Sequence, residues 1–173
     1  MPSNLLLQTD RDPDGLAVAS VGLDVFYTWD ELESRARRFA AALAAEGLEA
    51  GDRWALMAHN RIEWTPMVLG SLRAGTRYVP INWHLTADEV AYLLTDSGSR
   101  LLVVDAVDAE VGHQAAALAG IDRVVVIDPT PGQGEFEAWL ADHPVVRSVT
   151  TPRVPPADPK GSSGPTSGGR PPR

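Results

Sequence analysis

The stretch RYVPINWHLTADEVAYLLTDSGSRLLVV, residues 77–104, decides the fold because it places a helix pattern between two strand patterns. It opens on RYVPI and closes on LLVV, which are short apolar runs typical of buried strands. Between them, Thr86 and Glu89 have the spacing of a capping box and predict a helix start. Gly98 predicts the end of that helix. The stretch therefore predicts one strand–helix–strand unit.

The same alternation extends in both directions along the chain. Asn60 and Glu63 repeat the cap spacing and predict a second helix, with Pro66 bending it or delaying its start. Another helix is predicted over 109–118. Successive strands begin about 23 residues apart, which predicts an α/β fold with a mostly parallel sheet flanked by helices. The predicted strands are WALMA (54–58), RYVPI (77–81), LLVV (101–104) and RVVVI (123–127).

An antiparallel hairpin is predicted before the first helix. The runs LAVAS (16–20) and DVFYT (24–28) have strand character, and Gly22 is expected in the turn between them. Thr28 and Glu31 form a further capping box, so the hairpin leads directly into a helix.

The composition limits the classes of protein to which the chain can belong. The 173 residues are 44% hydrophobic, which suffices for one globular α/β unit, expected over residues 1–150. The absence of cysteine excludes disulfides and thiolate metal sites. A net charge of −8 disfavours a nucleic-acid partner. No apolar run is long enough for a membrane span, and the N-terminal segment lacks the basic start of a signal peptide. We therefore expect a cytoplasmic protein.

The segment 151–173 differs in composition from the rest of the chain. Proline, glycine and serine dominate it, so it cannot bury enough apolar surface to offset its ordering entropy, and we expect disorder. Its end, GSSGPTSGGRPPR, has the glycines and hydroxyls that can surround a phosphate group. Candidate phosphate-binding residues are Thr166, Ser167, Gly168 and Gly169, although linkers also produce such strings.

Histidine and acidic residues give no clear catalytic constellation. The four histidines lack local metal-ligand spacing, so we interpret them as surface or capping residues and predict no metal site. Acidic residues concentrate at predicted helix starts, where they favour the helix dipole. No catalytic residue is assigned. The histidines are His59, His84, His113 and His143, and the acidic residues at predicted helix starts are Asp30, Glu31, Glu63, Asp88 and Glu89.

Tryptophan is frequent and has two interpretations. The side chains could form a surface on which a ligand stacks, or they could pack in the core, which their positions in and beside predicted elements favour. Four of the five tryptophans are concerned: Trp29, Trp54, Trp64 and Trp83. The motif PGQGEF (131–136) is interpreted as a turn rather than a phosphate loop.

Two long stretches, residues 26–64 and 70–105, together with the strand that follows, resemble the N-terminal part of adenylate-forming enzymes. This family includes acyl-CoA synthetases, luciferases and the adenylation domains of peptide synthetases. The segment INWHLTADEVAYLLTDSGSRLL favours an acid–CoA ligase, because peptide-synthetase domains tend to place an aspartate and another proline at Asn82, Trp83 and His84.

The resemblance implies a two-step reaction. A carboxylate attacks the α-phosphate of ATP in the presence of Mg²⁺, giving an acyl adenylate and pyrophosphate, and the thiol of CoA then displaces AMP. The family carries a phosphate loop near the end of this chain, with a lysine. In our chain Pro172 takes that lysine position, and no alignment of the tail restores the lysine.

From the resemblance we expect a truncated acid–CoA ligase that binds no cofactor and is inactive alone. The tail is then either a degenerate phosphate loop or a segment translated out of frame from GC-rich DNA. An alternative is a stand-alone α/β module that binds a nucleotide or acyl-CoA or a partner. A small complete enzyme is a third hypothesis, which lacks a matched nucleophile and base in the sequence.

Overall fold

The structure is a computed structural model, and it describes residues 12–21 and 24–143. Its centre is a four-stranded sheet in the order β4-β3-β5-β6, in which every neighbouring pair is parallel. The predicted α/β class with a parallel sheet is confirmed. The strands are β3 (Arg53–Met57), β4 (Arg77–Pro80), β5 (Ser99–Asp105) and β6 (Val124–Ile127).

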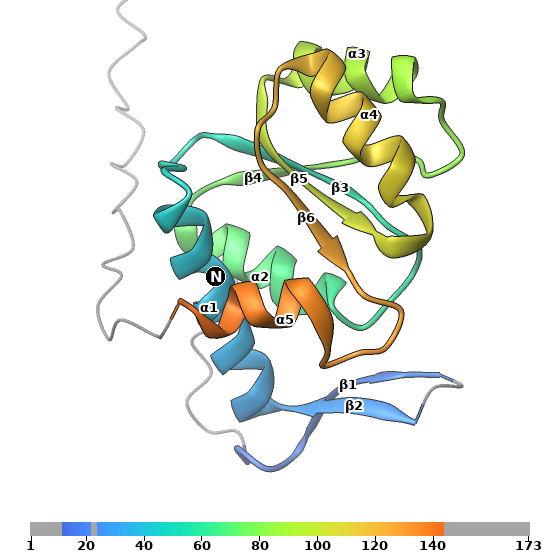
Figure 1. The fold of residues 1–173 in the computed structure, drawn as a ribbon. Helices are drawn as coiled ribbons and strands as arrows, with labels where there is room; N and C mark the ends of the chain where they lie inside the picture. The colour runs from blue at the N-terminus through green and yellow to red at the C-terminus, as the bar shows by residue number, and fades with distance from the viewer. Residues whose placement is uncertain (1–11, 22–23, 144–173) are drawn as a thin grey trace, which may run out of the picture.

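Helices cover both faces of the sheet (Figure 1). One face packs against α1 (Trp29–Ala45), α2 (Trp64–Ala74) and α5 (Gly134–Ala141). The other face packs against α3 (Ala87–Ser97) and α4 (Ala109–Ala119). A short 3₁₀ helix, η2 (Ala106–Asp108), joins β5 to α4.

The predicted hairpin is confirmed as an antiparallel pair, β1 (Leu16–Ser20) and β2 (Val25–Thr28). It lies apart from the four-stranded sheet, beside the start of α1 (Figure 1). Gly22, which we expected in the turn, lies outside the described residues, as does the predicted tail 151–173.

The alternation of side chains along the central strands divides the apolar residues between two cores. In β3, Trp54 and Leu56 point into the core with α1 and α2, whereas Ala55 and Met57 point into the core with α3 and α4. All four are fully buried. A parallel sheet covered on both faces therefore explains why its strands read as continuous apolar runs.

Two of the three predicted capping boxes are confirmed. Thr28 with Glu31 caps α1, and Thr86 with Glu89 caps α3, each with reciprocal side chain to backbone hydrogen bonds. The prediction for the second helix is wrong. Glu63 is the N-cap of α2, and its carboxylate binds the Arg61 guanidinium instead of closing a box with Asn60.

Proline is compatible with the start of α2 because of its position. Pro66 is the third residue of this helix, where a backbone N–H has no partner inside the helix in any case. The helix accordingly begins at Trp64, after the Asn60 cap expected from the sequence.

The order of the strands creates a switch point. The chain leaves β3 through α2 on one face of the sheet, and it leaves the neighbouring strand β5 through α4 on the other face. The connections therefore diverge from the carboxyl ends of β3 and β5, where open α/β sheets form a crevice. No helix within residues 12–21 and 24–143 is long and apolar enough to span a membrane.

The close contact of α1 with α2 predicts a cost for the change Gly70→Ala. A Cβ at Gly70 would lie 2.6 Å from the Ala36 carbonyl oxygen and 2.9 Å from Phe39 Cβ. At Gly112 the nearest atom would be a Val104 methyl carbon at 3.0 Å. We expect Gly70→Ala to lower the free energy of unfolding by about 1–3 kcal/mol through overpacking. In urea denaturation the matched control Gly112→Ala should cost clearly less, and equal costs would contradict the argument.

Tyr27 predicts a loss of stability at alkaline pH. Burial raises the pKa of its phenol to about 12, against the opposing charge of Arg35, whose guanidinium lies 4.7 Å from the ring centre. The phenol therefore loses its proton more readily in the unfolded chain, where its pKa is 10, than in the folded chain. The free energy of unfolding keeps its full value below pH 10 and falls as the pH rises from 10 to about 12.

Comparison with Tyr27→Phe isolates this effect. Between pH 8 and pH 11 the free energy of unfolding of the unmodified chain should fall by about 1.4 kcal/mol more than that of the variant. Urea denaturation followed by circular dichroism measures both. Identical pH profiles would show that the phenol titrates alike in the folded and unfolded chains.

Candidate functional site

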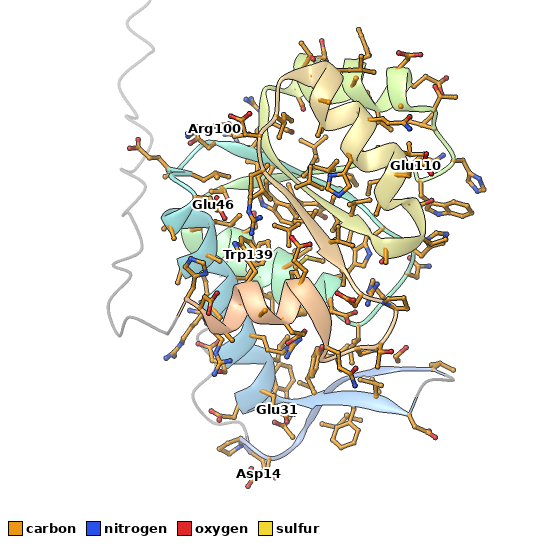
Figure 2. All side chains as sticks on the ribbon, in the orientation of Figure 1. Asp14, Glu31, Glu46, Arg100, Glu110 and Trp139 are labelled. Atoms are coloured by element: carbon orange, nitrogen blue, oxygen red, sulfur yellow. The ribbon has the colours of Figure 1, made fainter. Side chains whose placement is uncertain are left out.

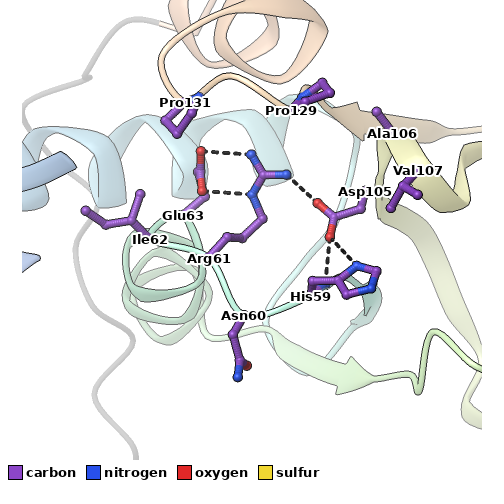
Figure 3. A pocket seen from close by; sticks show the side chains of 10 residues that line it. All are labelled: His59, Asn60, Arg61, Ile62, Glu63, Asp105, Ala106, Val107, Pro129 and Pro131. Carbon is purple, nitrogen blue, oxygen red and sulfur yellow. Dashed lines mark hydrogen bonds and ion pairs between the residues drawn. The ribbon is translucent and has the colours of Figure 1, made fainter. Parts of the chain in front are cut away.

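A cavity of about 240 Å³ lies at the switch point, beside the carboxyl ends of β3, β5 and β6 (Figure 3). The loop from His59 to Glu63, which follows β3, forms one side. Asp105, the last residue of β5, and the start of η2 form another. Pro129 and Pro131, which follow β6, complete the lining.

Asp105 holds the centre of this site. Its side chain is buried, and its Oδ2 atom accepts the His59 backbone N–H at 2.6 Å. The same oxygen lies 3.1 Å from His59 Nδ1. Its other oxygen, Oδ1, accepts a hydrogen bond from Arg61 Nη1. One carboxylate at the end of β5 thus fixes the loop that follows β3.

Arg61 extends the network to β6 and α2. Its Nε and Nη2 atoms donate to the two oxygens of Glu63 at 2.9 and 3.1 Å, a bidentate pair. Nη2 also donates to the Asp128 carbonyl at 2.6 Å. Burial lowers the pKa of the guanidinium, but the hydrogen bonds and charges of Glu63 and Asp105 outweigh it, so the pKa lies above its ordinary value.

These contacts decide what Arg61 can do chemically. Its donors serve Glu63, Asp105 and two carbonyls, so binding a phosphate would require breaking buried hydrogen bonds. We therefore assign Arg61 to positioning the loops and not to anion binding.

His59 lies at the exposed rim of the network. Its side chain is 40% exposed, and its ring stacks on Trp83 with the ring centres 4.0 Å apart. Trp83 also stacks on the neighbouring His84. Asp105 beside Nδ1 and Trp83 against the ring together fix the orientation of the imidazole.

Asp108 adds a second carboxylate to the same cluster. It follows β5 by one turn of η2, and its Oδ2 atom lies 3.5 Å from His59 Nδ1. Within the described residues no hydrogen bond reaches this oxygen, which is shielded from solvent. His59, Asp105 and Asp108 together place one imidazole nitrogen and two carboxylate oxygens within 4.8 Å of one another.

The site predicted from the tail cannot be placed. Thr166, Ser167, Gly168 and Gly169 lie outside the described residues, so their role in phosphate binding stays a prediction. The motif at 131–136 is a turn in its first half only, since residues 134–136 form the start of α5.

The histidines and acidic residues follow the sequence interpretation in part. His143 Nδ1 lies 2.7 Å from the Trp139 carbonyl at the end of α5, in a capping position. The acidic residues in the first turns of α1 and α3 lie where predicted. Glu63 also lies at a helix start, as the N-cap of α2, but its carboxylate is buried and ion-paired with Arg61.

The tryptophans mainly pack, as favoured. Trp54 is fully buried, its ring 4.9 Å from that of Phe39, and its Nε1 donates to Ser71 Oγ at 3.0 Å. Trp64 Nε1 donates to the His59 carbonyl. Trp83 is 38% exposed at the rim of the site.

The sequence interpretation missed Arg61, Asp105 and Asp108. Spacing between histidines could not detect the cluster, because the partner of His59 lies 46 positions further along the chain. One signal was present: a carboxylate directly after a buried strand, at the edge where parallel α/β sheets bind ligands.

Comparison with known proteins identifies the family. The sequence profile of the AMP-binding enzymes matches residues 7–162. This chain belongs to the AMP-binding enzyme family. Over 116 residues it is 35% identical to the fatty acid–[acyl-carrier-protein] ligase ScoC of Streptomyces coeruleorubidus, covering 67% of our chain. Over 88 residues, or 51% of our chain, it is 39% identical to the long-chain-fatty-acid–CoA ligase FadD13 of Mycobacterium tuberculosis.

The fold agrees with that of solved members of the AMP-binding family. Apo MatB from Rhodopseudomonas palustris superposes with a TM-score of 0.70 at 28% identity over 84% of this chain. The match covers 28% of the MatB chain, and the matches to ScoC and FadD13 cover 21% and 18% of those ligases. The chain therefore spans between about a fifth and just over a quarter of the length of these relatives.

The buried network predicts a large cost for the change Arg61→Met. Removal of the guanidinium leaves Asp105 and Glu63 as buried carboxylates without their partner, which should lower the free energy of unfolding by about 3–5 kcal/mol. The control is Arg37→Met, which breaks the exposed helical pair with Glu33 and should cost about 0.3–0.5 kcal/mol. Urea denaturation at pH 7 compares them, and similar costs would show that the network is not cooperative.

Proposed function

We propose that the chain forms the N-terminal α/β region of an acid–CoA ligase. The observation that carries this proposal is the family match over residues 7–162. Its relatives FadD13 and ScoC are named as ligases that join fatty acids to CoA or to an acyl-carrier protein. The reaction would activate a carboxylic acid with ATP and Mg²⁺ as an acyl adenylate, with CoA as the acceptor of the acyl group.

The cavities that the described residues form do not fit ATP or CoA. Their cavity at the switch point is about 240 Å³, below the roughly 300–1,000 Å³ of typical ligand pockets. The guanidinium beside it is occupied by Glu63 and Asp105. An apolar hollow beside α3 is bordered by Asp88 and Glu89, whose charges disfavour phosphate groups. We derive no step of the reaction through these residues.

We therefore propose that residues 12–143 contribute architecture to a ligase and that the 173-residue polypeptide does not form acyl adenylates by itself. Transfer of the adenylyl group of ATP to a carboxylate, with pyrophosphate as the leaving group, needs groups that stabilise charge in an enclosed site. The described part of the chain forms a folded sheet and a closed ion network, but it does not enclose a site of this kind.

A pyrophosphate-release assay tests this proposal. The purified chain, with ATP, Mg²⁺, CoA and a panel of fatty and aromatic acids, should give no turnover above a blank without protein. FadD13 assayed in parallel confirms that the reagents work. Formation of a thioester by the chain, unchanged after further purification, would overturn the proposal.

Calorimetry separates the proposal from the alternative of a stand-alone binding module. Titration of the chain with ATP and with CoA should show no binding tighter than about millimolar, since the cavity at the switch point is smaller than a typical ligand pocket and carboxylates border the hollow beside α3. Micromolar affinity for either compound would favour the binding module. Circular dichroism with cooperative thermal unfolding confirms that the sample is folded.

A further inference from the structure

The cluster at the switch point has the spacing of a tetrahedral metal site. A Zn²⁺ ion with bonds of about 2.0–2.1 Å places its tetrahedral ligands about 3.3 Å apart. His59 Nδ1 lies 3.1 Å from Asp105 Oδ2 and 3.5 Å from Asp108 Oδ2, values on either side of that distance. All three atoms lie within 4.8 Å of one another. Small side-chain adjustments would bring them around one ion.

The hydrogen bonds of the cluster leave one acceptor without a donor. A neutral imidazole has at most one proton on Nδ1, and that proton cannot serve both carboxylates. Asp105 Oδ2 is the nearer acceptor and also receives the His59 backbone N–H. Asp108 Oδ2 is shielded from solvent, and no hydrogen bond from the described residues reaches it. A cation bound between these atoms would satisfy it.

The charge balance favours a divalent cation. Among Asp108 and the residues that line the cavity, Arg61 is the one guanidinium, and its bidentate pair with Glu63 is electrically neutral. The carboxylates of Asp105 and Asp108 then add negative charge that this guanidinium does not balance. Since burial of uncompensated charge is costly, a dication would stabilise this edge of the sheet.

We propose that His59, Asp105 and Asp108 bind a divalent transition-metal ion of the zinc class. The ligands are His59 Nδ1, Asp105 Oδ2 and Asp108 Oδ2. His59 faces the cavity, so a water molecule can take the fourth position (Figure 3). Arg61, bound to the other oxygen of Asp105, and the backbone N–H of His59 orient the carboxylate, which is the role of groups behind a metal ligand.

The ligand set selects the class of metal. An imidazole nitrogen suits Zn²⁺, Co²⁺ and related ions, whereas Mg²⁺ and Ca²⁺ prefer oxygen ligands and higher coordination numbers. The ion would link the loop after β3 to η2 after β5, and so would hold the two strand ends together at the point where the connections diverge. This proposal does not depend on the proposed ligase function.

Titration with Co²⁺ tests the site in the full 173-residue chain. Bound Co²⁺ in tetrahedral coordination gives visible absorption bands, which should saturate at one equivalent and disappear when Zn²⁺ is added. The variant Asp108→Asn should weaken Co²⁺ binding by roughly tenfold or more. The matched control Asp122→Asn, an exposed aspartate before β6, should bind as the unmodified chain does.

Two outcomes would overturn the proposal: no saturable absorption at millimolar Co²⁺, or equal affinity in Asp108→Asn and Asp122→Asn. A second measurement needs no variant. In ¹H–¹⁵N spectra of the histidine rings, Zn²⁺ should shift the ring nitrogens of His59 and leave His113 and His143 unchanged. Equal shifts at all these histidines would indicate non-specific binding and would also contradict the site.

Discussion

The parallel sheet is the constraint from which the rest of the structure follows. Each parallel strand needs a crossover connection, and the helices of these connections cover both faces. The two resulting cores share the strands, with Trp54 and Leu56 in one and Ala55 and Met57 in the other. Because both faces of the sheet are apolar, the polar groups of this region lie at the ends of the strands. Because all four strands run in one direction, their carboxyl ends meet along a single edge, and the ion network of the molecule gathers there.

The network at that edge shows how a buried arginine can be structural. Arg61 joins the end of β5, the carbonyls after β6 and the N-cap of α2. Its donors are engaged within the fold, which separates it from the arginines that bind phosphates at exposed sites. His59 is different: held by Asp105 and stacked on Trp83, it presents its ring at the rim of the cavity (Figure 3). Away from this edge, the Trp139 indole N–H of α5 donates to the Glu46 carboxylate at the end of α1 (Figure 2).

Membership of the AMP-binding family gives this architecture a context without supplying a reaction centre. The chain matches solved family members closely in fold, yet it covers about a quarter of the MatB chain. The described residues include a sheet, its two cores and a polar edge. A ligase must also enclose ATP and an acyl group, and such enclosure generally arises between parts of a larger domain. That the chain has the fold of this family therefore does not imply that the polypeptide catalyses the ligase reaction.

The sequence by itself determined the succession of strands and helices along the chain, the hairpin and the two capping boxes, because these depend on residues near one another in the chain. It also carried the family resemblance, since that rests on pattern and spacing over a long stretch. Tertiary structure decided the rest. Glu63 has the spacing of a cap residue, but Arg61 captures its carboxylate in the buried loop before α2. His59 meets Asp105 and Asp108 because parallel pairing aligns the ends of β3 and β5, and no local spacing encodes that meeting.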